Sequence, residues 1–337
     1  MRLTNACSRA LGRPAAKAAA VLGVLGVIGL AGSLTAAAVL AWSVSDFTVT
    51  TATYTSTSAP TTGQPGTQSG SAVIGDYLSD SMTVKVQYFS YLPPSDYQFA
   101  LYSGKPSSNS CPVSQDGKQW LPSGSVFLSG VFSTSANSTN PYTVASTQAS
   151  PGSYRVTSAG SYYWIARYYD QVDNMTIFSN CTSEPVAVNA LTPTISTKLS
   201  AGSIAVGGSA HDSSKLSGAT ANAGGSVTYR YYTNNTCSAG QVVVGTVTVS
   251  GGMVPDSSAV TFNTAGSYYW QAVYSGDANN GGATSPCTSS NNELLVVNAL
   301  TPTISTKLSA GSIAVGGSAH DSSKLSGATA NAGGSVT

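Results

Sequence analysis

The chain has 337 residues, of which only 8% are charged, and its formal net charge is +1. Its basic residues cluster only within the first 17 positions, so binding driven by neutralisation of nucleic-acid phosphates is excluded. The 41% of hydrophobic residues, with 18 Tyr and 4 Trp, argue against a disordered chain, because they can bury enough apolar surface to offset the entropy of ordering.

Residues 1–46 have the pattern of an export segment. Four basic residues precede position 18, and the 25 residues from Ala18 to Trp42 carry no charge. A basic start, an apolar stretch and small residues at 36–38 are typical of a secretory signal peptide. A retained transmembrane helix is the alternative, because about 20 apolar residues are enough to span a bilayer. Either one exports the rest of the chain, and we expect membrane contact through this segment alone.

The next segment, residues 47–72, consists mainly of Thr, Ser, Gly, Pro and Gln and has no charged residue. Such a composition is typical of a flexible or weakly extended linker. We therefore expect a spacer here, with an O-glycosylated stalk as the alternative.

A long internal repeat dominates the remainder of the chain. Residues 189–228 recur without change at 298–337, which gives a period of 109 residues. A period near 100 is too long for a solenoid repeat and matches a whole small β domain. A weaker copy precedes these two, because AGSYYWIARYY at 159–169 and EPVAVNALTPT at 184–194 resemble AGSYYWQAVYS and ELLVVNALTPT further along.

The repeat defines three parts of the chain. We expect a first domain at 73–190, a second at 191–299, and a truncated third repeat at 300–337 whose strands lack partners. Within one repeat, short runs such as SVTYRYYT, QVVVGTVTVS and SYYWQAVYS are rich in β-branched and aromatic residues and are separated by turn residues. About seven such runs are the number in an immunoglobulin-like sandwich. The sequence therefore predicts an all-β protein of tandem immunoglobulin-like β-sandwiches after an N-terminal signal or transmembrane helix.

The string AGSYYWQAVYSGDANNGGATSPC, with VTYRYYTNNTC before it and LLVVNA after it, resembles the immunoglobulin-like repeats of secreted prokaryotic surface proteins. The resemblance is close over 191–299, partial over 73–190 and truncated over 300–337. In the first domain Tyr169-Asp170-Gln171-Val172-Asp173-Asn174 replaces the SGDANN segment. The resemblance implies β-sandwiches with a spacer, adhesive or wall-associated role and no catalysis.

Four cysteines follow the export segment, and they form one pair in each domain, Cys111 with Cys181 and Cys237 with Cys287. An even number of cysteines in each exported domain favours disulfide bonds. The repeat symmetry selects pairing within each domain, because every module of an array must be self-sufficient. A zinc site or a catalytic thiol would need C-x-x-C spacing or partner histidines. We expect each bond to join two loops at one end of its sandwich.

Alternation along the strands predicts which aromatic residues lie inside the sandwich. The predicted core aromatics are Tyr162, Trp164, Tyr268 and Trp270. The aromatics assigned to the other face, or to an aromatic-rich sheet surface, are Tyr163, Tyr229, Tyr231, Tyr232, Tyr269 and Tyr274. An exposed aromatic surface of this kind would be the contact site of a carbohydrate or a protein.

Acidic residues near the ends of the predicted hairpins are candidates for a calcium site. They are Asp277 in the second domain and Asp170 and Asp173 in the first. Calcium needs six to eight oxygen ligands, whereas Asp in a tight turn bonds to its own backbone. We therefore interpret these residues as turn formers and expect no metal and no cofactor.

His211 and His320 occupy equivalent positions, and each precedes an aspartate. Adjacent residues of a strand point to opposite faces, so His211 and Asp212 cannot form a catalytic dyad, and we interpret both as solvated strand residues. The sequence has no motif of a hydrolase, metalloprotease or nucleotide-binding enzyme. No catalytic residue is assigned.

These features predict an exported protein, secreted or at the cell surface, that acts as a structural spacer or adhesin-like stalk. The expected partner is a surface ligand or a cell-wall component, and self-association stays open. The alternatives are a carbohydrate- or protein-binding module, the spacer of an enzyme whose catalytic domain lies beyond residue 337, and a filament subunit in which an unpaired strand completes a neighbour. Unchanged repetition favours the spacer, because a specific binding site does not need identical copies in series.

Overall fold

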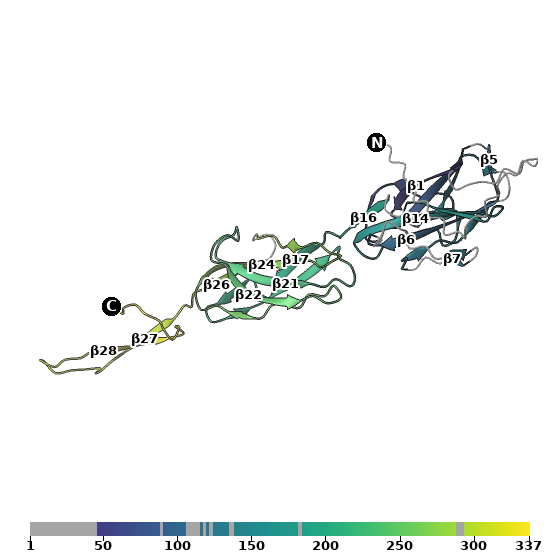
Figure 1. Ribbon diagram of the computed structural model, residues 1–337. Helices are drawn as coiled ribbons and strands as arrows, with labels where there is room; N and C mark the ends of the chain where they lie inside the picture. The colour runs from purple at the N-terminus through teal and green to yellow at the C-terminus, as the bar shows by residue number, and fades with distance from the viewer. Residues whose placement is uncertain are drawn as a thin grey trace, which may run out of the picture. The chain divides into compact units, whose positions relative to one another are not determined.

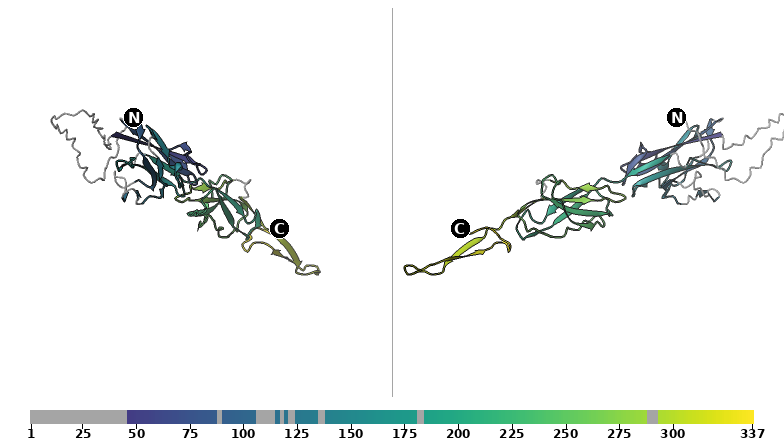
Figure 2. Two further views of the ribbon diagram at one scale, coloured as in Figure 1. Left: turned by 90° about the vertical axis from the view of Figure 1, so that its right-hand side faces the viewer. Right: turned by 60° about the vertical axis from the view of Figure 1, so that its left-hand side comes forward.

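The computed structural model describes residues 46–337, apart from 88–89, 106–114, 117–118, 121–123, 135–137, 181–183 and 288–292. The expected signal or transmembrane helix at 1–46 therefore lies outside the described residues, except for Asp46. In the described part, no helix is long and apolar enough to cross a membrane. Contacts divide the chain into two units, Met1–Ala190 and Leu191–Thr337, and both consist of β-strands (Figure 1). Figure 2 shows the same strands from two further sides.

The second unit contains a sandwich of two layers. One layer consists of two short two-stranded sheets: β17 (Thr194–Leu199) pairs antiparallel with β20 (Asp212–Ser217), and β19 (Ser209–Ala210) pairs antiparallel with β23 (Val260–Thr261). The other layer is one sheet with the order β18-β26-β24-β21-β22, and β25 also pairs with β24. Its strands are β18 (Ser203–Ala205), β21 (Ser226–Tyr232), β22 (Val242–Thr248), β24 (Gly266–Tyr274), β25 (Ala283–Thr284) and β26 (Leu294–Asn298).

The start of this sandwich contributes to both sheets. β17 belongs to one sheet, whereas β18 crosses to the other and lies parallel to the last strand, β26. A first strand that splits between two sheets and runs parallel to the last strand, within this strand order, defines an immunoglobulin-like sandwich. Ile195 of β17 packs against Tyr229 and Ala272 of the facing sheet, so the two inner faces form one core.

The first unit repeats this order with longer strands. One sheet runs β12-β4-β1-β2 and the other β10-β6-β14-β16-β3, with β3 parallel to β16. The strands of these two sheets are β1 (Phe47–Ser56), β2 (Thr67–Gln68), β3 (Ser71–Val73), β4 (Tyr77–Val86), β6 (Ser95–Ser103), β10 (Phe132–Thr134), β12 (Tyr142–Ala145), β14 (Gly160–Asp170) and β16 (Pro185–Asn189). Shorter strands at their margins and in the loops are β5 (Tyr91–Leu92), β7 (Gln115–Asp116), β8 (Gln119–Trp120), β9 (Phe127–Leu128), β11 (Ser138–Thr139), β13 (Tyr154–Arg155) and β15 (Met175–Phe178).

The expected linker at 47–72 is wrong, because this segment provides the first strands of the first unit. β1 pairs with β4 along its whole length, from Phe47 opposite Val86 to Ser56 opposite Tyr77. Phe47 and Thr53 of β1 are buried. The composition predicted a linker because threonine is polar, but threonine is also β-branched and favours strands. The sandwich therefore starts near residue 46 and not at residue 73.

The truncated third repeat forms a hairpin of β27 (Thr303–Leu308) and β28 (Asp321–Ser326). Its register is the one that the identical residues adopt in β17 and β20. Ile195 and Leu199 are 4% and 7% exposed, whereas the equivalent Ile304 and Leu308 are 49% and 61% exposed. Hairpin pairing thus follows from the local sequence, while burial requires the strands that come later in a repeat.

This pair of identical segments predicts a difference in amide hydrogen exchange. Burial of two aliphatic side chains contributes about 3–6 kcal/mol, so amides of Thr194–Leu199 should exchange at least about 100-fold more slowly than those of Thr303–Leu308. Exchange followed by mass spectrometry of the full chain measures both segments in one sample, through peptides that include Ala187, just before the earlier copy, or Val296, just before the later one, and therefore differ in mass. Because the intrinsic exchange rates are equal for equal sequences, similar protection of the two segments would contradict the structure.

Candidate functional site

The aromatic residues of the longest inner strands are structural. Tyr162 donates a hydrogen bond from its hydroxyl to the carbonyl oxygen of Ser158 at 2.9 Å, and Tyr268 donates to Thr264 at 3.0 Å. Such a tyrosine corner is characteristic of the sixth strand of an immunoglobulin-like sandwich, where a cysteine follows two residues later in antibody domains. Trp164 and Trp270 stand at that position in this chain.

Both tryptophans lie in the core, on the face that alternation predicts. Trp164 and Trp270 are 1% and 0% exposed, Tyr162 is buried, and Tyr268 is half-buried against Phe262 with ring centroids 4.6 Å apart. An indole thus fills the space between the sheets that a disulfide bond occupies in antibody domains.

The expected aromatic surface is wrong for most of its members. Tyr229, Tyr232 and Tyr274 are buried, and the ring of Tyr231 lies 5.8 Å from that of Trp270. The assignment of Tyr274 to the outer face is wrong because Tyr274 lies four residues after Trp270 and shares the face of that residue. Tyr163 and Tyr269 are half-buried, so these residues do not form an aromatic platform for stacking a sugar.

The disulfide bond of the second unit joins two loops, as the sequence predicts. Cys237 lies between β21 and β22, Cys287 lies between β25 and β26, and the Cα atoms of the bonded pair are 5.9 Å apart. Cys111 and Cys181 lie outside the described residues, so their pairing stays a prediction. The bond closes a loop of 50 residues, and a loop of this length restricts the unfolded chain strongly.

Asp277 organises a turn. Its Oδ1 accepts hydrogen bonds from the backbone N–H groups of Asn279 and Asn280, at 2.7 and 2.9 Å, and its Oδ2 accepts one from Gly224 at 2.6 Å. Burial alone would raise the pKa of Asp277, but the donated hydrogen bonds outweigh it and lower the pKa. These protein donors engage both carboxylate oxygens, as expected of a turn former.

The acidic pair of the first unit has the same character. Asp170 is fully buried, and its Oδ1 accepts hydrogen bonds from the backbone N–H groups of Val172 and Asp173. Burial raises the pKa of Asp170, and Asp173 is exposed. In the described part of the chain, no group of three or more His, Cys, Asp or Glu side chains is arranged to hold a metal ion.

The interpretation of Asp212 as a solvated residue is wrong. His211 is exposed and its Nε2 lies 3.9 Å from the Asp256 carboxylate, but Asp212, on the opposite face of β20, is fully buried. The two neighbours do point to opposite faces, as alternation requires, and the inner face at this point accommodates a carboxyl group. In the third repeat the equivalent Asp321 is exposed.

Sequence reasoning also missed three further buried or half-buried carboxyl groups. Asp80 and Glu293 are fully buried, and Glu184 is half-buried. The sequence does contain a pattern that points to two of these groups. In a chain with only 8% charged residues, Glu184 and Glu293 precede the matching segments PVAVNALTPT and LLVVNALTPT. A charge that recurs at the same place in two diverged copies, beside an apolar strand, indicates a structural use inside the fold.

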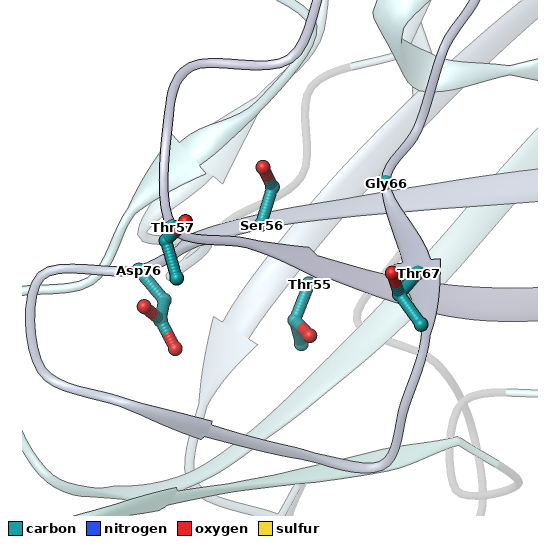
Figure 3. Close-up of a pocket in the computed structure, with 6 residues that line it drawn as sticks. All are labelled: Thr55, Ser56, Thr57, Gly66, Thr67 and Asp76. Atoms are coloured by element: carbon teal, nitrogen blue, oxygen red, sulfur yellow. The ribbon is translucent and has the colours of Figure 1, made fainter.

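One surface pocket of the first unit, of about 270 Å³, is lined by Thr55, Ser56, Thr57, Gly66, Thr67 and Asp76 (Figure 3). Hydroxyl groups dominate its wall. Its one carboxylate, Asp76, accepts a hydrogen bond from the backbone N–H of Val73 at 3.0 Å. The residues that line it include no histidine, lysine or cysteine, so Asp76 is the one acid–base group of this wall.

The strand order and the tyrosine corners define the chain as a tandem protein of immunoglobulin-like modules. No family model and no curated protein matches its sequence. It is similar to the solved fibronectin(III)-like modules of Clostridium thermocellum CbhA, with 14% identity, a TM-score of 0.23, and coverage of 75% of this chain and 95% of that chain.

Two further solved structures are similar to parts of the chain. The ectodomain of mouse nectin-like molecule 4 (Ig1–Ig3) has 16% identity and a TM-score of 0.19, with 68% of this chain and 61% of that chain covered. A Salmonella alpha-2-macroglobulin has 9% identity and a TM-score of 0.25, with 78% and 18% covered. Because all these scores are low, the fold class rests on the strand order of the chain itself.

Replacement of Cys237 and Cys287 by Ser should lower the free energy of unfolding of the second unit by up to about 4 kcal/mol, because the 50-residue loop then gains freedom in the unfolded chain. Urea unfolding measures the loss. The double variant Cys111→Ser/Cys181→Ser is the matched control and should leave the second unit unchanged. Peptide mapping without reduction should detect both bonds, and free thiols at these positions would refute the pairing.

Asp277→Ala should lower the free energy of unfolding of the second unit by about 1–2 kcal/mol, because three backbone N–H groups lose their acceptor. Asp277→Asn keeps one acceptor oxygen and should lose less. Thermal unfolding with and without millimolar calcium measures both effects. Calcium should not change the midpoint of the unsubstituted chain, and a calcium-dependent rise that Asp277→Ala removes would show a metal site instead of a turn.

Proposed function

We propose that the chain is a non-catalytic, exported spacer that carries load along tandem immunoglobulin-like modules and presents or attaches another part of the cell surface. The observation that supports this proposal most directly is the parallel pairing, in each unit, of the last strand with a strand near the start. Ser203–Ala205 pairs with Val296–Asn298, and Ser71–Val73 pairs with Ala187–Asn189.

Parallel terminal strands resist tension because of their direction. A pull on the N-terminal end of β18 and the C-terminal end of β26 displaces the two strands in opposite directions along their axes. The hydrogen bonds between them lie across the strands, so they are loaded together in shear instead of opening one after another. The same geometry holds for β3 and β16 in the first unit.

Three other features support a spacer. Only residues 190–193 separate β16 from β17, and this connection contains Pro193, whose ring restricts the backbone. The Cys237–Cys287 bond keeps 50 residues from extending when the second unit opens. The surface of the chain is uncharged for the most part, as suits a module that has no charged ligand.

Single-molecule extension of the full chain, held by its two ends, tests the proposal. We expect a separate unfolding event for each unit. Reduction of the second disulfide should lengthen the extension of its event by about 17 nm, because 50 more residues are then free to extend at about 3.4 Å each. The substitution Ile204→Gly, in β18 opposite Val297 of β26, should lower the unfolding force of the second unit and leave that of the first unit unchanged.

Unfolding of the two units without any resolvable event would refute a load-bearing role. A glycan array and a cell-wall pull-down with the same chain test the alternative. Saturable binding that depends on residues of one module would make the chain a binding module.

A further inference from the structure

The core of the second unit contains two carboxyl groups without a cation to neutralise them. Asp212 begins β20, Glu293 directly precedes β26, and both are fully buried. No hydrogen bond of good geometry reaches any of their four carboxyl oxygens, although the backbone N–H groups of Lys198 and Ser213 lie near Asp212. Unpaired buried carboxylates are strongly disfavoured in a protein interior, so these groups need a physical explanation.

Backbone pairing holds both groups in place. The N–H of Asp212 donates to Ser257 Oγ at 2.9 Å, and the N–H of Ser257 donates back to the carbonyl oxygen of Asp212 at 2.8 Å. Glu293 lies opposite Trp270, whose backbone N–H donates to its carbonyl oxygen at 2.8 Å. The indole Nε1 of Trp270 is also buried without a partner.

The first unit has the same set of residues. The N–H of Asp80 donates to Ser146 Oγ at 3.1 Å, and the β14–β16 register places Glu184 opposite Trp164. One oxygen each of Asp80 and Glu184, and the indole Nε1 of Trp164, are buried without a partner. Two units that differ over much of their sequence thus contain the same Asp, Ser, Glu and Trp at equivalent places in the sandwich.

The charged groups around the pair in the second unit are mostly acidic. Burial raises the pKa of Glu293 to about 9, and the charge of Asp212 adds to this shift. Burial raises the pKa of Asp212 to about 7. The backbone N–H groups of Lys198 and Ser213 act in the opposite direction and lower this pKa, whereas the charge of Asp256 raises it further.

The other titratable neighbours do not neutralise the pair. Tyr229, from the facing sheet, is itself raised to a pKa of about 12 by burial, with Asp212 and Asp256 contributing. His211 faces outward and lies beside Asp256. The contact between these two side chains is the one ion pair found among the described residues. In the first unit, burial and the charge of Glu184 raise the pKa of Asp80, and burial raises that of Glu184.

We propose that each unit holds a structural proton on its buried core carboxyl groups, an aspartate and a glutamate, so that the sandwich is stable in acid and opens when this proton is lost at alkaline pH. A protonated carboxyl group is uncharged, so it avoids the cost of an unpaired charge in the protein interior. A second negative charge beside the first, in a medium of low dielectric constant, would cost more than the fold can offset.

The direction of the pH dependence follows from the raised pKa values. A carboxyl group whose pKa is higher in the folded chain than in the unfolded chain favours folding below its unfolded value, near pH 4. This contribution falls as the pH rises through the folded value. The unfolding equilibrium constant of the second unit should therefore rise by up to about tenfold per pH unit for each proton released, up to about pH 9.

Urea unfolding of the full chain at about pH 5 and about pH 9 tests the proposal, with each unit followed through its own peptides by pulse proteolysis and mass spectrometry. The midpoint of the second unit should be lower at about pH 9. Glu293→Gln, which is neutral at every pH and of the same size, should remove most of this difference. The first unit should keep its pH dependence in Glu293→Gln and show a smaller one in Glu184→Gln, because burial still raises the pKa of Asp80.

The third repeat provides a matched control. Asp212→Asn and Asp321→Asn change the same residue within identical sequences, but Asp321 is exposed, so only Asp212→Asn should alter the pH dependence. If the variants do not fold, carbon-13 NMR of the carboxyl groups in the unsubstituted chain decides the question. A Glu293 carboxyl that titrates near pH 4, equal midpoints at both pH values, or equal effects of the two Asn variants would overturn the proposal.

Discussion

The parallel contact of the last strand with a strand near the start, β18 with β26 and β3 with β16, is the constraint on which each unit depends. It forces the initial strand to leave its first sheet, as β17 gives way to β18, and to cross the edge of the sandwich before it meets β26. The chain therefore enters a unit at one end of its strands and leaves it at the other. Both units satisfy this constraint although their strands differ in length.

The interior of each sandwich is organised around an indole instead of a disulfide bond. Trp164 and Trp270 occupy the position where antibody domains place a cysteine, and the cysteines of the second unit lie in loops outside the sheets. This separation gives the two stabilising elements different roles. The indole fills the core of the folded state, while the loop disulfide restricts the unfolded chain and limits how far an opened unit extends.

Periodicity of two, the cysteine spacing and the 109-residue repeat were sufficient to predict the sandwich fold, the inward tryptophans and the Cys237–Cys287 bond. Composition wrongly predicted a linker at Phe47–Ser56, because threonine occurs both in polar linkers and in β-strands. Only the pairing of this segment with β4 decides between the two. The buried Asp212 was missed for a related reason. Alternation shows only that His211 and Asp212 point to opposite faces, and polarity suggested solvent for both. The burial of Asp212 depends on the packing of its sheet against the facing one, which the local sequence does not encode.

The identical segments 189–228 and 298–337 also bear on the order in which the chain can fold. Neighbouring copies of one sequence risk exchanging partners during folding. Here the two copies take different positions. The earlier copy packs into the core, where Ile195 is buried, whereas the later copy pairs only within its own hairpin and leaves Ile304 exposed. One sequence thus serves as a core strand or as an isolated hairpin, and the strands around it decide which.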